Sequence, residues 1–317
     1  MDTKKVDLLS QKDCVAYTSK RYNKAFKDKV FAVALVVPAF LMISFTILFP
    51  LLNVIRMSFL KYSLMAMQSM PWNNFANYKA LFEDMEFVNT FGRTLVYVFS
   101  TAGLALVIGF STSLLLNSGI AGQKLFRGLI FLPWTVPTLV VAVLWMWIYQ
   151  PQYGILNYIL NSLHIINNNK QWLGDVKLAL PSVIIAAVWK QMPFMMVMLL
   201  AALQTVPKEL EEAAIIDGAT GIQKFFNITV PCTMSVMKTI TLTSVITNFQ
   251  MFGLFFTMTG GGPVKATTTL TIYTYQTAFM RYNMGKGAAI GVIWMAFLIL
   301  FSTFYNKMMS KKEAFSI

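Results

Sequence analysis

The sequence predicts an all-α membrane protein, and two observations lead to that prediction. Hydrophobic residues make up 56% of the chain and charged residues 12%, which is too little polar surface to cover a soluble globule of this length. The apolar residues also gather in runs, each close to the roughly 20 residues with which a helix crosses the hydrocarbon core of a bilayer. Most of the chain should therefore contact lipid.

Six uncharged or nearly uncharged runs follow one another along the chain, and each predicts one transmembrane helix. We expect a basic tail at 1–29, a transmembrane domain at 30–309 and a short tail at 310–317. The first run is not followed by a small-residue cleavage site, so we expect it to remain as an anchor. The six runs cover residues 30–55, 94–117, 128–149, 178–204, 239–258 and 287–306.

The basic residues predict that both termini are cytoplasmic. With that orientation the inner segments hold 16 Lys and Arg residues and the outer segments hold eight, and cytoplasmic loops of membrane proteins carry such an excess. The net charge of +13 does not indicate nucleic-acid binding, because the basic residues neither cluster on one face nor alternate with stacking aromatic residues. We therefore expect membrane lipid, and no nucleic acid, as a partner.

No group of residues has the spacing of a catalytic or metal site. Cys14 and Cys232 are too far apart for a CxxC pair, and His164 has no companion at metal-ligand spacing. The phosphate-binding pattern GxxxxGK[ST] is absent, since the glycines at 260–262 are followed by Pro263. We expect no catalytic residue, no metal and no cofactor in this chain.

The segment between the fourth and fifth runs has the signals of a short helix that ends in a turn. Pro207 suits the first turn of a helix, the acidic residues up to Glu212 complement its positive end, and Gly218 can adopt a left-handed conformation. Ala213 and Ala214 would let another backbone approach closely. These features predict a docking surface. The alternative is a helix lying on the membrane surface, which acidic residues disfavour at an anionic inner leaflet.

The same segment carries the pattern EAAxxDGAxxxxxFxxIxxP, with all nine specified positions present from Glu212 to Pro231. This pattern resembles the signature loop of binding-protein-dependent ATP-binding-cassette permeases. In that family the loop forms a coupling helix that sits in a groove of the cytoplasmic ATPase subunit. The resemblance assigns the coupling role to Glu212, Ala213, Ala214, Asp217 and Gly218.

Further motifs are similar to those of carbohydrate-uptake permeases, and the resemblance covers about residues 90–305. The motifs include Phe131-Leu132-Pro133, Trp189-Lys190 and the Thr259-Gly260-Gly261-Gly262-Pro263 turn. They look most like the subunit that carries the Gly-Gly-Pro turn in the maltose-type heterodimer. Taken singly, the prolines and glycines also fit a simple kink and a tight turn.

The resemblance implies a permease subunit in the cytoplasmic membrane of a prokaryote that moves a sugar or related polar solute by alternating access. It implies a second homologous permease, two ATPase subunits that hydrolyse ATP with Mg, and an extracytoplasmic solute-binding protein as partners. The alternatives are an importer for a non-sugar solute such as a glycerol phosphate, an ion-coupled secondary transporter, and a scaffold without transport. A secondary transporter should carry buried ionisable groups at midplane, and Lys190 is the one clear candidate.

Polar residues in the fourth and fifth runs are candidates for a solute path, because polar groups are costly in lipid unless they face a cavity or a partner. A sugar requires neutral donors and acceptors beside aromatic rings. For each residue the alternative is a hydrogen bond to a helix of the sister subunit, and we expect Lys190 to cap or pair structurally. By resemblance to the maltose-type permease, the pocket-lining stretches match Gln191, Phe194, Ser244, Asn248 and Met251.

Overall fold

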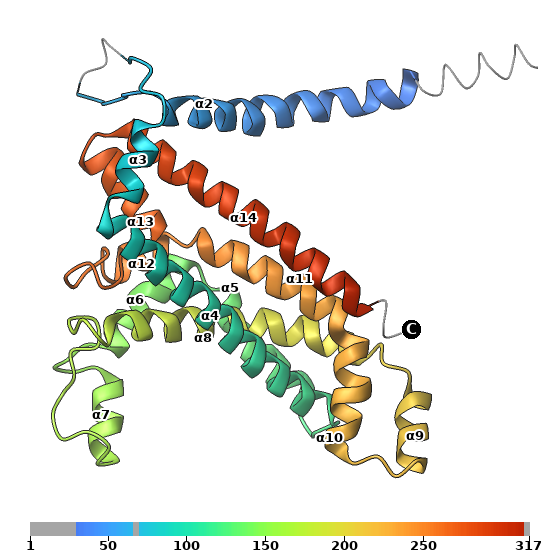
Figure 1. Ribbon diagram of the computed structural model, residues 1–317. Coiled ribbons are helices and arrows are strands. Elements are labelled where there is room, and N and C mark those ends of the chain that lie inside the picture. Colours follow the sequence, from blue (N-terminus) through green and yellow to red (C-terminus); the bar gives the residue numbers. More distant parts are fainter. Residues whose placement is uncertain (1–29, 66–69, 314–317) are drawn as a thin grey trace, which may run out of the picture. The chain divides into compact units, whose positions relative to one another are not determined.

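The computed structural model describes residues 30–65 and 70–313 (Figure 1). Helices are the only regular elements in these ranges, beside two isolated β-bridges. The predicted tail at 1–29 lies outside the described residues, whereas the tail predicted at 310–317 is helical as far as Glu313. The chain divides into two parts, one ending at Arg56 and one beginning at Met57.

The first part is a helical segment whose apolar residues are exposed on all sides. Its helix runs through Val30–Ser58, two residues past the boundary at Arg56, with a mean hydropathy of 2.6, and none of its most apolar window is buried. It contains the π-helical turn η1 (Ser44–Leu48) and ends in α2 (Phe49–Ser58). A helix that is apolar all round is suited to lipid, as the sequence predicted for the first run.

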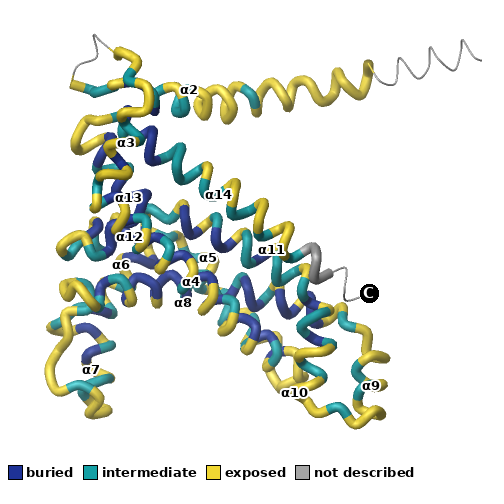
Figure 2. Tube along the Cα trace, viewed as in Figure 1, coloured by how far each residue is buried: buried dark blue, intermediate teal, exposed yellow. Residues whose placement is uncertain are grey.

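The second part holds the remaining helices. Its buried residues concentrate where α4, α8 and α11 pack together, while α9 is exposed (Figure 2). The helices of the first half are α3 (Ala76–Phe82), α4 (Met85–Asn117), α5 (Gln123–Thr135), α6 (Thr138–Ile148), α7 (Ile155–Ser162) and α8 (Ala179–Leu203). Those of the second half are α9 (Lys208–Ile216), α10 (Gly221–Lys224), η2 (Phe225–Thr229), α11 (Val230–Phe249), α12 (Gly253–Met258), α13 (Leu270–Tyr275), η3 (Gln276–Met280) and α14 (Met284–Glu313).

Among the described residues, four helices are long and apolar enough to cross a membrane, or five if a bent pair is counted as one span. They are Val30–Ser58, α4, α8 and the Met284–Met309 part of α14, and the bent pair is α5 with α6. The predicted number of six is therefore not confirmed. The fifth predicted run, 239–258, is interrupted, because α11 ends at Phe249 and α12 begins at Gly253.

The third predicted run, 128–149, is not one continuous helix. Its two halves, α5 and α6, meet at an angle of 100°. The break falls on Val136, which is extended with φ −72° and ψ 133°, because a residue before proline is disfavoured in the helical conformation and Pro137 comes next. Lys190 of α8 donates a hydrogen bond from Nζ to the Val136 carbonyl oxygen. This contact confirms the expected structural role of Lys190 and satisfies a backbone group that the bend exposes.

Helices α4 and α8 approach closely at a glycine of α4. A Cβ atom placed on Gly109 would lie 3.0 Å from Met195 Cβ and 3.1 Å from the Met196 backbone nitrogen. Nearby positions of α4 are also small and buried, including Ala102 and Ala105. Small residues at helix crossings let backbones pack closely in membranes, where dispersion contacts hold helices together.

Gly109→Val should therefore destabilise the fold, because the added side chain would push α8 away from α4. Overpacking of this kind costs about 1–3 kcal/mol. Gly103→Val is the matched control, since Gly103 lies on the same helix and a Cβ atom there meets nothing within 4 Å. Thermal unfolding in detergent should show a lower midpoint for Gly109→Val alone, and equal midpoints for the two variants would contradict the close packing.

Candidate functional site

A pocket of about 220 Å³ lies between α5, α8 and α11. The Trp134 and Phe194 rings stack in its wall with centroids 5.7 Å apart and planes 16° from parallel. The wall carries hydroxyl and amide groups but no charged side chain, which suits a neutral polar ligand that also presents an apolar face. The lining residues are Trp134, Gln191, Phe194, Met195, Ile240, Thr243, Ser244 and Thr247.

A paired amide contact links α8 to α11 behind this pocket. Gln191 Nε2 donates to Asn248 Oδ1, and Asn248 Nδ2 donates back to Gln191 Oε1, each over 2.8 Å. Tyr97 of α4 donates its hydroxyl to Asn248 Oδ1 at 2.9 Å, and Ser244 Oγ donates to Gln191 Oε1 at 3.3 Å. The four side chains satisfy one another, which removes most of the cost of burying them.

The five predicted path residues separate into three groups. Gln191, Phe194 and Ser244 line the pocket. Asn248 is 1% exposed and lies behind the wall, where its amide bonds to residues of this same chain. Met251 is outside the pocket lining, and its carbonyl oxygen accepts a hydrogen bond of 3.0 Å from Thr271 Oγ1. The structure therefore brings three of the predicted residues to one cavity, with Asn248 behind its wall and Met251 outside its lining.

Sequence reasoning did not identify Trp134, Thr243 and Thr247 of the wall or Tyr97 behind it. The two threonines could have been found, because Thr243 and Thr247 are four residues apart and so share a face of α11 with Ser244 nearby. Their hydroxyl hydrogens bond to backbone carbonyl oxygens one turn earlier, and their oxygen lone pairs remain as acceptors. Trp134 comes from a distant helix, which no spacing rule would join to α11.

Helix α9 has the caps that the sequence predicted for the short helix of the signature pattern. It begins after Pro207 and ends at Ile216. Gly218 is left-handed with φ 75°, and the Ala219 N–H returns to the Ala214 carbonyl oxygen at 2.9 Å, which is a typical glycine C-cap. No residue of α9 is buried, and Ile216 is 85% exposed.

A family model described as the binding-protein-dependent transport system inner membrane component matches residues 102–313. The chain belongs to this family. It is therefore an ATP-binding-cassette transporter permease and not an enzyme, in agreement with the motifs of the sequence. The match includes both α9 and the helices that form the pocket.

Relatives of this permease are similar over most of its length. The sulfoquinovosyl glycerol transport system permease protein SmoG of Agrobacterium fabrum is 32% identical over 90% of this chain and 92% of its own. The trehalose/maltose transport system permease protein MalF of Thermococcus litoralis is 34% identical over 75% of this chain and 79% of its own. The crystal structure of a bacterial alginate ABC transporter, in complex with a periplasmic protein that holds an alginate pentasaccharide, contains a chain of the same fold. That chain is 19% identical, with a TM-score of 0.78 over 92% of this chain and 97% of its own.

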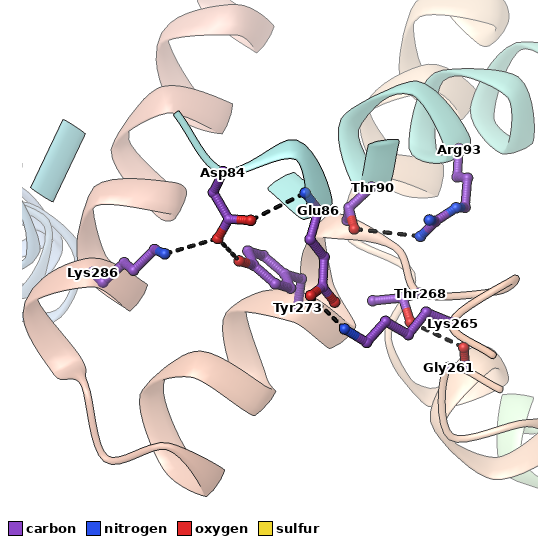
Figure 3. A network of polar contacts seen from close by, with 9 residues as sticks. All are labelled: Asp84, Glu86, Thr90, Arg93, Gly261, Lys265, Thr268, Tyr273 and Lys286. Atoms are coloured by element: carbon purple, nitrogen blue, oxygen red, sulfur yellow. Dashed lines mark hydrogen bonds and ion pairs between the residues drawn. The ribbon is translucent and has the colours of Figure 1, made fainter. Parts of the chain in front are cut away.

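A second polar group in the permease joins the beginnings of α4 and α14 (Figure 3). Asp84 caps α4 by accepting the Glu86 N–H at 3.0 Å, and its other carboxylate oxygen accepts from Lys286 Nζ at 2.9 Å and from the Tyr273 hydroxyl at 2.7 Å. Glu86 also pairs with Lys265. We call Asp84, Glu86, Lys265, Tyr273 and Lys286 the Asp84 network. Its members come from two stretches that are far apart in the sequence, residues 84–86 and 265–286.

The Asp84 network also holds the predicted glycine turn in place. Gly260 and Gly261 both have positive φ, and the Gly262 N–H donates to the Thr259 carbonyl oxygen at 2.9 Å, which confirms the tight turn. Lys265 lies just beyond the turn and reaches Glu86 of α4. The turn is thus tied to the beginning of the long helix that packs behind the pocket.

The Asp84 network should make the stability of the permease depend on acid pH. Burial by itself raises the pKa of Asp84, but hydrogen bonds from Lys286 and Tyr273 and the Lys286 charge outweigh it, and the pKa falls from 3.8 to about 2. Because the folded pKa is lowered, this stabilisation is present above pH 3.8 and is lost as the pH falls to about 2. Asp84→Asn should remove that part of the pH dependence of the thermal midpoint.

Glu83→Gln is the control for Asp84→Asn. Glu83 is next in the chain, but its pair with Lys79 spans 3.9 Å and both side chains are more than half exposed, so it should contribute little. Thermal midpoints between about pH 5 and pH 2 should fall in parallel for the wild type and Glu83→Gln. A parallel fall in Asp84→Asn would contradict the assignment.

Proposed function

We propose that this permease belongs to an importer of a neutral sugar or similar polyol, with the pocket between α5, α8 and α11 on the solute path. The uncharged wall of that pocket is the observation that carries the proposal. Stacked aromatic rings can lie against the C–H face of a sugar, and the hydroxyl and amide groups can bond its hydroxyls. In the proposed cycle the permease exposes this path to each side of the membrane in turn.

The relatives leave the charge of the solute open, and the pocket favours a neutral one. Their names include trehalose/maltose and sn-glycerol-3-phosphate transport. A phosphate is usually held by Arg, Lys or several backbone N–H groups, and the lining of this pocket contains no Arg or Lys. Lys190 is next to Gln191 in the chain, but its ammonium group bonds to the Val136 carbonyl oxygen. A neutral solute therefore fits this wall better than a glycerol phosphate.

A matched pair of threonines tests the pocket. Thr243→Val keeps the shape of a lining residue and removes its hydroxyl, whereas Thr239→Val makes the same change one turn earlier on α11, outside the pocket. Loss of one hydrogen bond costs about 1 kcal/mol, so the KM for uptake should rise about fivefold in Thr243→Val and stay unchanged in Thr239→Val. The measurement is uptake of labelled trehalose and maltose by cells with the complete importer, with sn-glycerol 3-phosphate as competitor. Equal KM values, or strong competition by the phosphate ester, would contradict the proposal.

We further propose that α9 and its C-cap form the coupling helix, with Glu212, Ala213, Ala214, Asp217 and Gly218 facing a groove of the ATPase. Its exposed apolar side chains support this role, because Ile215 and Ile216 are 63% and 85% exposed and would be covered by a partner. The proposed assembly contains a second homologous permease, two ATPase subunits that hydrolyse ATP with Mg, and an extracytoplasmic binding protein.

In the proposed topology the permease has six spans, and both termini and α9 are cytoplasmic. The broken pair α5 and α6 provides one span, and α11 with α12 provides another that is interrupted after Phe249. Helices α7 and α9 flank α8 in the chain and lie at its opposite ends (Figure 1), so α7 would be extracytoplasmic. Helices α3 and α13, which adjoin or contribute to the Asp84 network, lie on the same side as α7 (Figure 1).

Glu212→Lys tests the coupling helix. If Glu212 pairs with a basic residue of the ATPase, reversing its charge should cost at least the roughly 2–5 kcal/mol of a truncated buried pair. The ATPase should then no longer co-purify with the tagged permease, and uptake should be lost. Glu83→Lys makes the same change of charge at another exposed position and should leave both intact. Normal ATPase recovery and normal uptake in Glu212→Lys would rule out this role, and they are the result expected if α9 instead lies on anionic lipid.

A further inference from the structure

A second and larger pocket, of about 760 Å³, opens on the surface beside α7. It lies within residues 152–169, between α6 and α8, and shares no residue with the pocket on the proposed solute path. Its lining consists of tyrosine, amide, hydroxyl, glycine and isoleucine residues, without a charged side chain. Exposed surfaces are ordinarily rich in charged residues. The absence of charge from the lining of an exposed pocket therefore indicates a specific role for that lining.

The frame of this pocket is fixed by buried contacts. Asn157 is 2% exposed, and its Oδ1 accepts from Trp172 Nε1 at 2.9 Å and from the Lys170 N–H at 3.2 Å. Its Nδ2 donates to the Lys170 carbonyl oxygen at 3.0 Å. Gly154 allows a close turn, since a Cβ atom there would lie 2.3 Å from the Gln150 carbonyl oxygen. The groups on the pocket surface are thus held in place before any ligand arrives.

Two tyrosines and an amide pair make up the binding surface. Tyr153 and Tyr158 are 71% and 73% exposed, far more than aromatic residues that pack in a core. Asn161 Nδ2 donates to Asn169 Oδ1 at 2.6 Å, which orients the Asn161 amide and leaves its oxygen free as an acceptor. Gln152 adds another amide to the lining. Exposed rings beside fixed amides can stack on the C–H face of a sugar and bond neighbouring hydroxyl groups.

We infer that the pocket beside α7 is a second binding site, which takes neutral carbohydrate at the surface of the permease. The absence of charge in the lining selects against sugar phosphates and other anions. The pocket holds about three and a half times the volume of the one between α5, α8 and α11, so it can accept several sugar rings. In the proposed topology the site faces the extracytoplasmic side, where it would capture solute outside the membrane.

The competing explanation is that α7 docks on lipid or on another protein, and the exposed apolar residues of α7 test it. Ile159 and Leu163 are 44% and 62% exposed on or at the end of the same helix, but they do not line the pocket. If α7 docked on lipid or on another protein, these residues would contribute as much as the tyrosines. A carbohydrate site depends on residues of the pocket lining such as Tyr153 and Tyr158, and not on Ile159 or Leu163.

The test is binding of maltotriose to the full chain in lipid nanodiscs, measured by saturation-transfer NMR titration with sn-glycerol 3-phosphate as the anionic probe. We expect saturable binding of maltotriose and none of the phosphate ester. Tyr158→Ala should weaken binding about tenfold, and Tyr158→Phe should retain most of it because the ring remains. Leu163→Ala should bind like the wild type. These side chains are exposed, so folding should not be affected.

Three outcomes would overturn the inference. They are no saturable binding of maltotriose, equal affinity in Tyr158→Ala and the wild type, or equal loss in Tyr158→Ala and Leu163→Ala, which would indicate a docking surface. The site is also separable from the proposed solute path. Thr243→Val changes only the other pocket, so it should leave binding at Tyr158 unaffected even if it alters uptake.

Discussion

The cost of leaving a polar group unpaired in the membrane interior is the constraint on which this structure depends. This cost explains the contact at the break between α5 and α6. Val136 is extended there, and its carbonyl oxygen accepts a hydrogen bond from the Lys190 ammonium group. The same cost explains the reciprocal amide pair of Gln191 and Asn248. Both contacts anchor α8 to a neighbouring helix. The same interactions that satisfy buried groups therefore also fix the helices around the pocket between α5, α8 and α11.

This constraint explains the character of the pocket wall. Asn248 and the Lys190 ammonium group are occupied by contacts within the chain and do not line the cavity. The wall presents aromatic rings, the Gln191 amide, and threonine and serine oxygens that can accept hydrogen bonds. A surface of this kind can hold a solute by many weak and similar contacts, which suits a site that must also release it.

The sequence predicted what depends on neighbours in the chain and failed where distant segments meet. Runs of apolar residues predicted α4, α8 and α14, and the caps of α9 followed from Pro207 and Gly218, because these signals are local. The apolar runs did not predict the break at Val136, since hydropathy is insensitive to the direction of a helix, although the prolines of this run left a kink open as an alternative. Asp84 precedes a long apolar helix and could have been recognised as a cap, but its partner Lys286 lies 202 residues away. The position of Met251 outside the pocket follows from the interruption after α11, which composition alone did not show.

The glycine contact between α4 and α8 has a mechanical consequence. At Gly109 the α4 backbone lies against Met195 Cβ and the backbone of Met192 and Met196, so that even a single added Cβ would be crowded by α8. The amide pair and Tyr97 join the same two helices to α11. We expect α4, α8 and α11 to move together as one rigid unit. The bend at Val136, where α5 and α6 meet at 100°, is tied to the same group of helices through Lys190 of α8.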